Sequence, residues 1–122
     1  MGGLLYSAAK AAVTQVTRIA GMELGRYGIT VNCISPGAIA TPIFYGGSSG
    51  ARKLEPAHDA AKMRKLTSNL DRATPLHRAG MPLDIANAVL YLAGDEGAYV
   101  NCHDWVIDVG MTAGQVANVG GE

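Results

Sequence analysis

The sequence predicts an α/β fold, and three features of its 122 residues support that prediction. Residues 5–24 are rich in alanine and other apolar side chains, and glycines follow at once, as is typical of a helix and its end. Residues 29–35 form a short apolar run with β-branched side chains, which is typical of a buried parallel strand. A second helix and strand follow near the C-terminus, so we expect a right-handed parallel crossover.

The first helix carries apolar residues on more than one stripe, so two buried faces are expected, one against the sheet and one against a partner. The apolar residues in this segment are Ala8, Ala9, Ala12, Val13, Val16, Ile19, Ala20 and Leu24. In the strand that follows, Asn32 is the polar exception. We interpret it as a buried amide that ties neighbouring loop backbones together, with a direct ligand role as the alternative. Residues 36–50 are predicted to be a loop, most flexible at its glycine-rich end, 46–50.

Residues 56–70 are predicted to form an amphipathic helix, because proline suits a first helical turn. Its inward residues would be Ala57, Ala60, Ala61, Leu66 and Leu70. Its outward residues would be Lys62, Arg64 and Lys65. A linker over 71–81 leads to a last helix at 82–93, with a buried stripe of Ile85, Ala86, Ala88, Val89 and Leu92. The final strand is expected at 105–108.

Composition limits the function classes. Ten basic and ten acidic residues balance at pI 6.8, which does not indicate a nucleic-acid or acidic-membrane partner. No apolar run reaches the ~18 residues that a membrane helix needs, and the N-terminus does not fit a signal peptide, so we expect a cytoplasmic location. Cys33 and Cys102 lie in apolar contexts and are expected to be reduced.

Tyr6 and Lys10 are the leading candidates for catalysis. A spacing of four residues places the phenol and the ammonium on one helix face, a turn apart. A cation at that distance stabilises phenolate relative to phenol, which would let Tyr6 exchange a proton with an alcohol or carbonyl oxygen near pH 7.

The residues C-terminal to Tyr6 and Lys10 limit which protein families the sequence resembles. They include the motifs Val31-Asn32, Pro36-Gly37, Thr41-Pro42 and Asp108-Val109-Gly110. In this order they resemble the C-terminal half of the short-chain dehydrogenase/reductase family, over about residues 3–114. The resemblance implies the C-terminal part of a doubly wound, Rossmann-type parallel sheet, with about two strands and three main helices.

The resemblance also implies roles for individual residues. Tyr6 would be the acid/base, and Lys10 would assist it and bind the nicotinamide ribose. Pro36, Gly37, Ile39 and Thr41 would hold the nicotinamide, so that NAD or NADP exchanges a hydride with a secondary alcohol or ketone. The implied layout is residues 1–44 for catalytic helix, strand and nicotinamide loop, 45–81 for a variable substrate lid, 82–114 for the last helix and strand, and 115–122 for a tail. A homo-oligomer, dimer or tetramer, is expected of the complete enzyme.

The family's N-terminal half holds the glycine-rich cofactor turn and a catalytic serine, and these do not occur in the 122 residues. The chain alone is therefore expected to be inactive and to expose apolar helix faces. The alternative is a non-catalytic fragment that associates with full-length subunits through its helices. Two departures from the family pattern are Val109 and Cys102, at positions where glycine is common. If the Cys102 backbone needs a positive φ, a side chain there costs roughly 1–2 kcal/mol.

Other chemistries are disfavoured. The three histidines, with Asp59 and Asp104, match no metal-ligand spacing. Ser7 lacks a nucleophile-elbow sequence and a nearby base. The glycine-rich segment 46–50 lacks the lysine of a phosphate loop. A free-standing metal- or ligand-binding module remains the third and least favoured interpretation.

Overall fold

The structure is a computed structural model, and it describes residues 3–45 and 56–114. Its helices are α1 (Leu4–Leu24), α3 (Pro56–Ala73) and α4 (Pro82–Ala93), and its short 3-10 helices are η1 (Gly25–Tyr27) and η2 (Asp95–Gly97). Its strands are β1 (Cys33–Pro36) and β2 (Asp104–Ile107). No helix within the described ranges has the length and apolarity that crossing a membrane requires.

The chain divides into two compact units. The first unit comprises Met1–Ser35 and Ile85–Val106, and the second comprises Pro36–Asp84 and Ile107–Glu122. Each unit is described by itself below.

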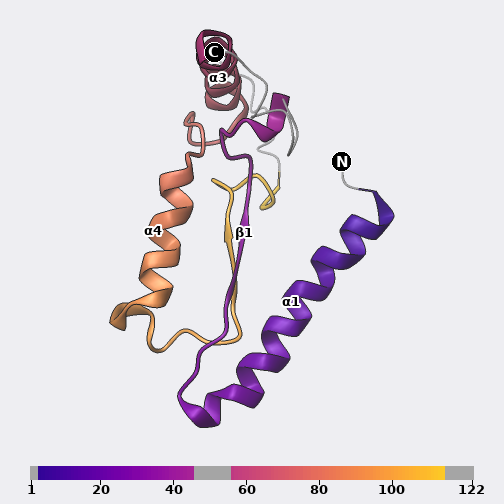
Figure 1. Cartoon of the computed structure of the whole chain (residues 1–122), viewed down its shortest axis with the longest axis vertical. Coiled ribbons are helices and arrows are strands. Elements are labelled where there is room, and N and C mark those ends of the chain that lie inside the picture. Colours follow the sequence, from indigo (N-terminus) through magenta and orange to yellow (C-terminus); the bar gives the residue numbers. More distant parts are fainter. Residues whose placement is uncertain (1–2, 46–55, 115–122) are drawn as a thin grey trace, which may run out of the picture. The chain divides into compact units, whose positions relative to one another are not determined.

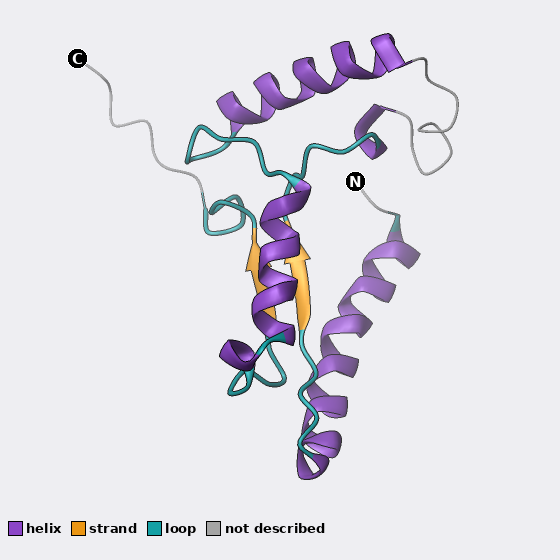
Figure 2. Ribbon diagram, turned by 60° about the vertical axis from the view of Figure 1, so that its left-hand side comes forward, coloured by secondary structure: helices purple, strands orange, loops and turns teal. Residues whose placement is uncertain are grey.

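The strands β1 and β2 pair in parallel, as the α/β prediction requires. The amide of Cys33 donates to the carbonyl of His103, and the amide of Gly37 donates to the carbonyl of Ile107. Partner numbers rise together along both strands, which is the signature of a parallel ladder. Figure 2 shows the two strands side by side with their arrows in the same direction.

In the first unit, α1 and α4 lie on opposite sides of the strand pair (Figure 1). Side chains alternate between the two faces, as strand geometry dictates. Ser35 and Asp104 face α1, where both contribute to hydrogen bonds. Ile34 lies with Leu92 of α4 in a shallow hollow on the other face. The result is a three-layer arrangement of helix, strands and helix.

The core of the second unit is a small apolar cluster. Ala40, Leu70 and Ala79 are buried, and Ala38, Met63 and Leu66 pack against them at its edge. Leu70 and Leu66 were predicted to face inward on α3, and this is confirmed. Ala60 and Ala61 were predicted inward but are exposed, because the buried stripe instead follows positions 63, 66, 67 and 70. The predicted outward residues Lys62, Arg64 and Lys65 are exposed.

Helix boundaries agree closely with the sequence. The α1 helix starts at Leu4, one residue before the predicted start, and ends at Leu24 as predicted. The α4 helix runs from Pro82 to Ala93, as predicted. Gly28 closes η1 in the left-handed conformation, with φ 73°, which suits a residue without Cβ. The α3 helix ends three residues later than predicted, at Ala73.

The first strand is shorter than predicted and begins at Cys33 rather than at residue 29. The amide of Val31 donates to the side-chain oxygen of Asn101 instead of to a strand. Regular pairing therefore starts only after this side-chain contact. The second strand is shifted by one residue from the predicted 105–108, to Asp104–Ile107.

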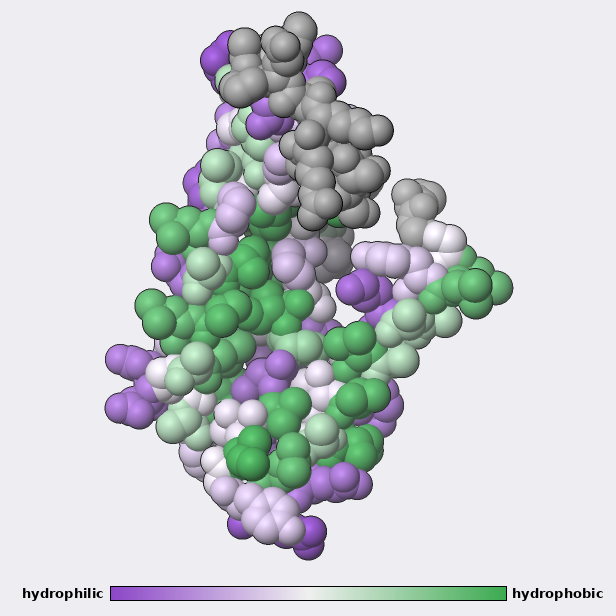
Figure 3. Space-filling model, viewed as in Figure 1, coloured by the Kyte–Doolittle hydropathy of each residue, from purple (hydrophilic) through white to green (hydrophobic). Residues whose placement is uncertain are grey.

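The apolar face of α1 is largely exposed, as expected for this chain alone. Only Thr17 and Gly21 of this helix are buried, whereas Val16 is 66% exposed. Hydrophobic residues reach the surface along α1 in Figure 3. The predicted stripe of α4 is likewise mixed, with Ala88 buried but Ala86 and Val89 exposed. Two strands offer too little surface to cover these helices.

The glycine-rich segment 46–50 is predicted to be the most flexible part of its loop, and residues 115–122 are predicted to be a tail. Both segments lie outside the described residues.

Candidate functional site

Tyr6 and Lys10 lie one turn apart on the same face of α1, as their spacing predicts. The Lys10 Nζ is 5.5 Å from the centroid of the Tyr6 ring, which is the geometry of a cation–π contact. Tyr6 is 60% exposed, and Lys10 is exposed as well. The phenol and the ammonium are thus both accessible to a ligand on this face of the helix.

Pro36, Gly37, Ile39 and Thr41 follow β1 directly, at the carboxyl end of a parallel strand. Such strand ends are where open α/β sheets bind ligands. A Cβ at Gly37 would lie only 2.7 Å from both the Cα and the Cβ of Asp108. Glycine is therefore required here by the close approach of the two strand ends, a structural reason separate from the predicted cofactor contact.

Ile39 and Thr41 contact each other within this loop. The Thr41 hydroxyl donates to the Ile39 carbonyl at 3.3 Å. Ile39 also forms an isolated parallel bridge with Gly80, in which the Ala40 amide donates to the Gly80 carbonyl at 2.7 Å. The bridge ties the loop to the segment that precedes α4.

The predicted site residues fall into two sets. Tyr6 and Lys10 belong to the first unit, and the residues from Pro36 to Thr41 belong to the second. Within each set the residues are neighbours on one element.

Asp104, the first residue of β2, is a polar anchor that sequence reasoning did not single out as functional. Its Oδ2 accepts the Thr14 hydroxyl of α1 at 3.0 Å, and its Oδ1 accepts the Ser35 hydroxyl of β1 at 2.6 Å. The Ser35 hydrogen bond lowers the pKa of the Asp104 carboxyl, although partial desolvation opposes this; bonds from Thr14 and Cys33 and the charge of Arg18 lower it further. The sequence feature that could have identified Asp104 is an acidic residue at the start of an otherwise apolar strand.

Two asparagines join loop backbones in the first unit. The Asn32 amide nitrogen donates to the Val100 carbonyl, and its oxygen accepts the His103 amide, which confirms its predicted tying role. Asn32 is half-buried rather than buried. Asn101 accepts the amides of Val31 and Cys102 and donates to the Gly21 carbonyl at 2.9 Å.

The two positions that depart from the family pattern are both strained. Cys102 has φ 58° and Val109 has φ 52°, so each side chain sits in the left-handed region that favours glycine. The condition stated for Cys102, a positive φ, is therefore met. Asp108 holds the turn after β2 by accepting the amides of Gly110 and Thr112 and the Thr112 hydroxyl, and these bonds lower its pKa.

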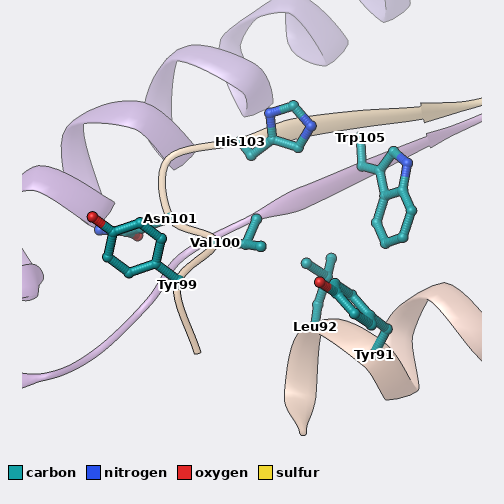
Figure 4. A pocket seen from close by; sticks show the side chains of 7 residues that line it. All are labelled: Tyr91, Leu92, Tyr99, Val100, Asn101, His103 and Trp105. Carbon is teal, nitrogen blue, oxygen red and sulfur yellow. The ribbon is translucent and has the colours of Figure 1, made fainter. Parts of the chain in front are cut away.

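A shallow hollow of about 350 Å³ lies between the end of α4 and the start of β2 (Figure 4). Its rings include Tyr91 and Trp105, which meet edge to face with centroids 5.6 Å apart. His103 also lines it. None of the predicted catalytic or nicotinamide residues borders this hollow. Among the described residues, no group of three or more His, Cys, Asp or Glu is arranged to hold a metal ion.

In the second unit, Tyr45 is held to α3. Its hydroxyl donates to the Asp59 carboxylate at 2.6 Å, and the Lys62 Nζ lies 5.8 Å from the centre of its ring. The hydrogen bond to Asp59, assisted by desolvation and by the charge of that carboxylate, raises the pKa of Tyr45 to about 12. The contact joins the end of the loop after Thr41 to the helix of the predicted lid.

Comparison with known proteins places this geometry in a family. Residues 2–112 match the family model described as enoyl-(acyl carrier protein) reductase. A levodione reductase of Leifsonia aquatica is 37% identical over 88% of this chain and 38% of its own length. A short-chain type dehydrogenase/reductase of Picea abies is 41% identical over 79% of this chain and 30% of its own length.

A solved structure gives the same result. The structure of a 4-hydroxyisoleucine dehydrogenase complexed with NADH superposes with a TM-score of 0.68 and 31% identity, over 90% of this chain and 40% of the other. The chain thus spans less than half the length of the proteins it matches. It belongs to the short-chain dehydrogenase/reductase family, whose Rossmann fold its helices and parallel strands share in part.

Proposed function

We propose that this chain is the C-terminal portion of an NAD(P)-dependent oxidoreductase acting on a secondary alcohol or ketone. The observation that carries the proposal is the pair of accessible side chains on one face of α1, with the Lys10 Nζ 5.5 Å from the Tyr6 ring. Membership of a family of oxidoreductases supports it, as do the activities named for two relatives, one a reductase and the other a dehydrogenase.

Tyr6 is the proposed acid/base. Its hydroxyl would give a proton to the carbonyl oxygen of a ketone as hydride arrives at the carbonyl carbon. In the reverse direction, its phenolate would take the proton of an alcohol hydroxyl as hydride leaves the carbon that bears that hydroxyl. Lys10 would stabilise the phenolate by its charge and donate hydrogen bonds to ligand hydroxyls. Both tasks require an exposed helix face, which α1 provides.

NAD or NADP is the proposed cofactor, since a relative of known structure is complexed with NADH. When bound, its nicotinamide would supply or accept the hydride. The residues after β1 fit such a group chemically. The Thr41 hydroxyl donates its hydrogen bond to the Ile39 carbonyl, so the lone pairs of its oxygen are left to accept an amide N–H. Pro36 and Gly37 would bring the backbone close to the ring, and Lys10 would bind the ribose.

Substitution of Tyr6 tests the proposal in the complete enzyme. Tyr6→Phe removes only the hydroxyl, so turnover should fall by at least 10²-fold while NADH binding changes little. Tyr27→Phe is the matched control, because Tyr27 is exposed beyond the end of α1 and should leave turnover unchanged. Retained turnover in Tyr6→Phe would sink the assignment.

The chain by itself should show little NADH oxidation and no cooperative melt, because its 122 residues contain no glycine-rich cofactor turn and α1 exposes apolar side chains. These exposed side chains favour a second candidate function, association with full-length subunits without catalysis. Co-purification with such a subunit would support the second candidate, and measurable oxidation by the isolated chain would exclude it. The proposal also includes three further predictions. The complete enzyme would form a homo-oligomer, residues 45–81 would form a substrate lid, and the enzyme would be cytoplasmic.

A further inference from the structure

The carboxylate of Asp104 connects the helix of the proposed catalytic pair to the strand that leads to the proposed nicotinamide loop. One oxygen bonds Thr14 on α1, and the other bonds Ser35 on β1. Thr14, Ser35 and Asp104 belong to the first unit, so these contacts stand whatever the placement of the second. The partners are 90 and 69 residues away from Asp104 in sequence, so the contact is wholly tertiary.

Thr14 continues the stripe of α1 that carries Tyr6 and Lys10. The three residues are spaced by four, so they follow one side of the helix with a rise of about 6 Å per step. Fixing the Thr14 hydroxyl therefore fixes the direction in which the phenol and ammonium point. Ser35 is the residue directly before Pro36, where the proposed nicotinamide loop begins.

Packing alone does little to fix the position of α1 on the side that faces the strands. Its buried residues are Thr17 and Gly21, a small side chain and none at all. A contact made by so few buried side chains leaves a helix freer to rotate or slide, whereas a hydrogen bond to a fixed oxygen has a preferred distance and angle. The Asn101 amide supplies a second fixed point, farther along the helix, at the Gly21 carbonyl.

A carboxylate suits this position better than an amide. Ionised Asp accepts hydrogen bonds at both oxygens, so it serves two hydroxyl donors at once, whereas Asn has one acceptor oxygen. Bonds to an ionised acceptor are also roughly twice as strong as neutral ones. The hydrogen bond from Ser35 first, and then Thr14, Cys33 and Arg18, lower the pKa of Asp104, so these contacts favour its ionised form.

We propose that Asp104 is a positioning residue of this oxidoreductase, which sets the rotation of α1 relative to β1 and thereby the direction of Tyr6 and Lys10. The inference rests on the proposed function of that pair. Asp104 is not itself assigned a contact with substrate or cofactor.

The first test uses the complete enzyme and measures the ionisation of the Asp104 carboxyl directly. The Asp104 carboxyl is titrated by ¹³C NMR in the wild type and in Thr14→Val, which keeps the shape but removes the hydroxyl. We expect the Asp104 pKa to lie below its ordinary value and to rise in Thr14→Val and in Ser35→Ala. Thr14→Ser should keep the wild-type titration, and Asp95→Asn, an exposed acid in η2, should leave it unchanged. An Asp104 titration that is identical in wild type and Thr14→Val overturns the inference.

The second test uses the complete enzyme and reads catalysis. A misdirected acid/base slows the chemical step, and a shift of about 1 Å can cost ~10²-fold. Asp104→Leu should therefore lower kcat by roughly 10- to 100-fold while KM for NADH changes less than about twofold. Thr14→Val should lower kcat in the same way and Thr14→Ser should restore it, a pattern that simple loss of folded protein would not give.

The two proposals fail in distinguishable ways. If Tyr6→Phe abolishes turnover but Asp104→Leu keeps the wild-type kcat, the positioning role is wrong and the proposed function stands. If Tyr6→Phe retains turnover, the proposed function is wrong, and the positioning role that rests on it is wrong as well.

Discussion

The two units of the chain differ in the interactions that stabilise each of them internally. The second unit has an apolar cluster in which Ala40, Leu70 and Ala79 are buried together. The first unit joins its elements through polar side chains that bond across long stretches of sequence; these are Asn32, Asn101 and Asp104. An apolar cluster responds to lost volume, whereas a polar anchor responds to lost donors or acceptors at nearly constant volume. Substitutions can therefore test whether the two units really differ.

The largest effect is expected in the apolar cluster. Leu70→Ala removes the largest buried side chain of the cluster and leaves a cavity, which should destabilise the second unit by about 2–4 kcal/mol. Amide hydrogen exchange along α3 measures this as faster local opening. Leu76→Ala is the matched control, because Leu76 is 67% exposed in the same unit and should cost little. Equal effects of the two substitutions would mean that the cluster does not hold α3.

In the first unit the corresponding effect should come from a polar atom. Asn101→Ala removes one donor and one acceptor that together serve three backbone groups, at Val31, Cys102 and Gly21. We expect a cost of about 1–3 kcal/mol, seen as faster exchange of the Val31 and Cys102 amides. Asn87→Ala, on the exposed face of α4, should stay within about 0.5 kcal/mol of the wild type. Unchanged protection in Asn101→Ala would contradict the comparison.

Backbone strain gives a smaller effect of opposite sign in both units. Val109→Gly relieves a left-handed β-branched residue and should stabilise the turn after β2 by about 1 kcal/mol. Cys102→Gly should give a similar or smaller gain in the first unit, since the thiol also contacts the α1 surface near Gly21. Val106→Gly is the control, because Val106 lies in β2 with ordinary backbone and should lose stability. Denaturant-dependent amide exchange compares the three variants.

The smallest effect is a pH dependence confined to the second unit. The Asp59 carboxylate raises the pKa of Tyr45 to about 12, above its ordinary value near 10. A raised pKa means that the contact stabilises the fold fully below pH ~10 and that this contribution is lost as pH rises to about 12. We expect the ¹³C NMR signal of the Tyr45 phenol carbon to titrate near 12 and to return toward 10 in Asp59→Asn. Tyr45→Phe identifies the signal, and a titration near 10 in the wild type would refute the contact.

The sequence predicted what depends on local pattern. Pro82 begins α4, and Gly94 follows its last residue, so both ends of that helix could be placed to the residue. Tyr6 and Lys10 share a helix face because a spacing of four dictates it. The parallel pairing of the strands also followed from their long connection, and the structure confirms it.

What the sequence could not give depends on partners far along the chain. The strand near residue 29 was predicted too long because a side chain 70 residues away takes the Val31 amide. The role of Asp104 was hidden for the same reason, since neither Thr14 nor Ser35 is near it in sequence. The apolar pattern of α1 predicts which faces of the helix are apolar but does not identify what covers them, and in this chain those faces are largely exposed.

The stripe of Tyr6, Lys10 and Thr14 makes the helix sensitive to length as well as to residue type. Each added residue turns a helix by about 100° and advances it by about 1.5 Å. A single residue inserted between Lys10 and Thr14 would leave every side chain chemically intact, yet it would carry the phenol and ammonium about a quarter of a turn away from their direction. At the positions between Lys10 and Thr14, a substitution should therefore be easier to accommodate than an insertion or a deletion.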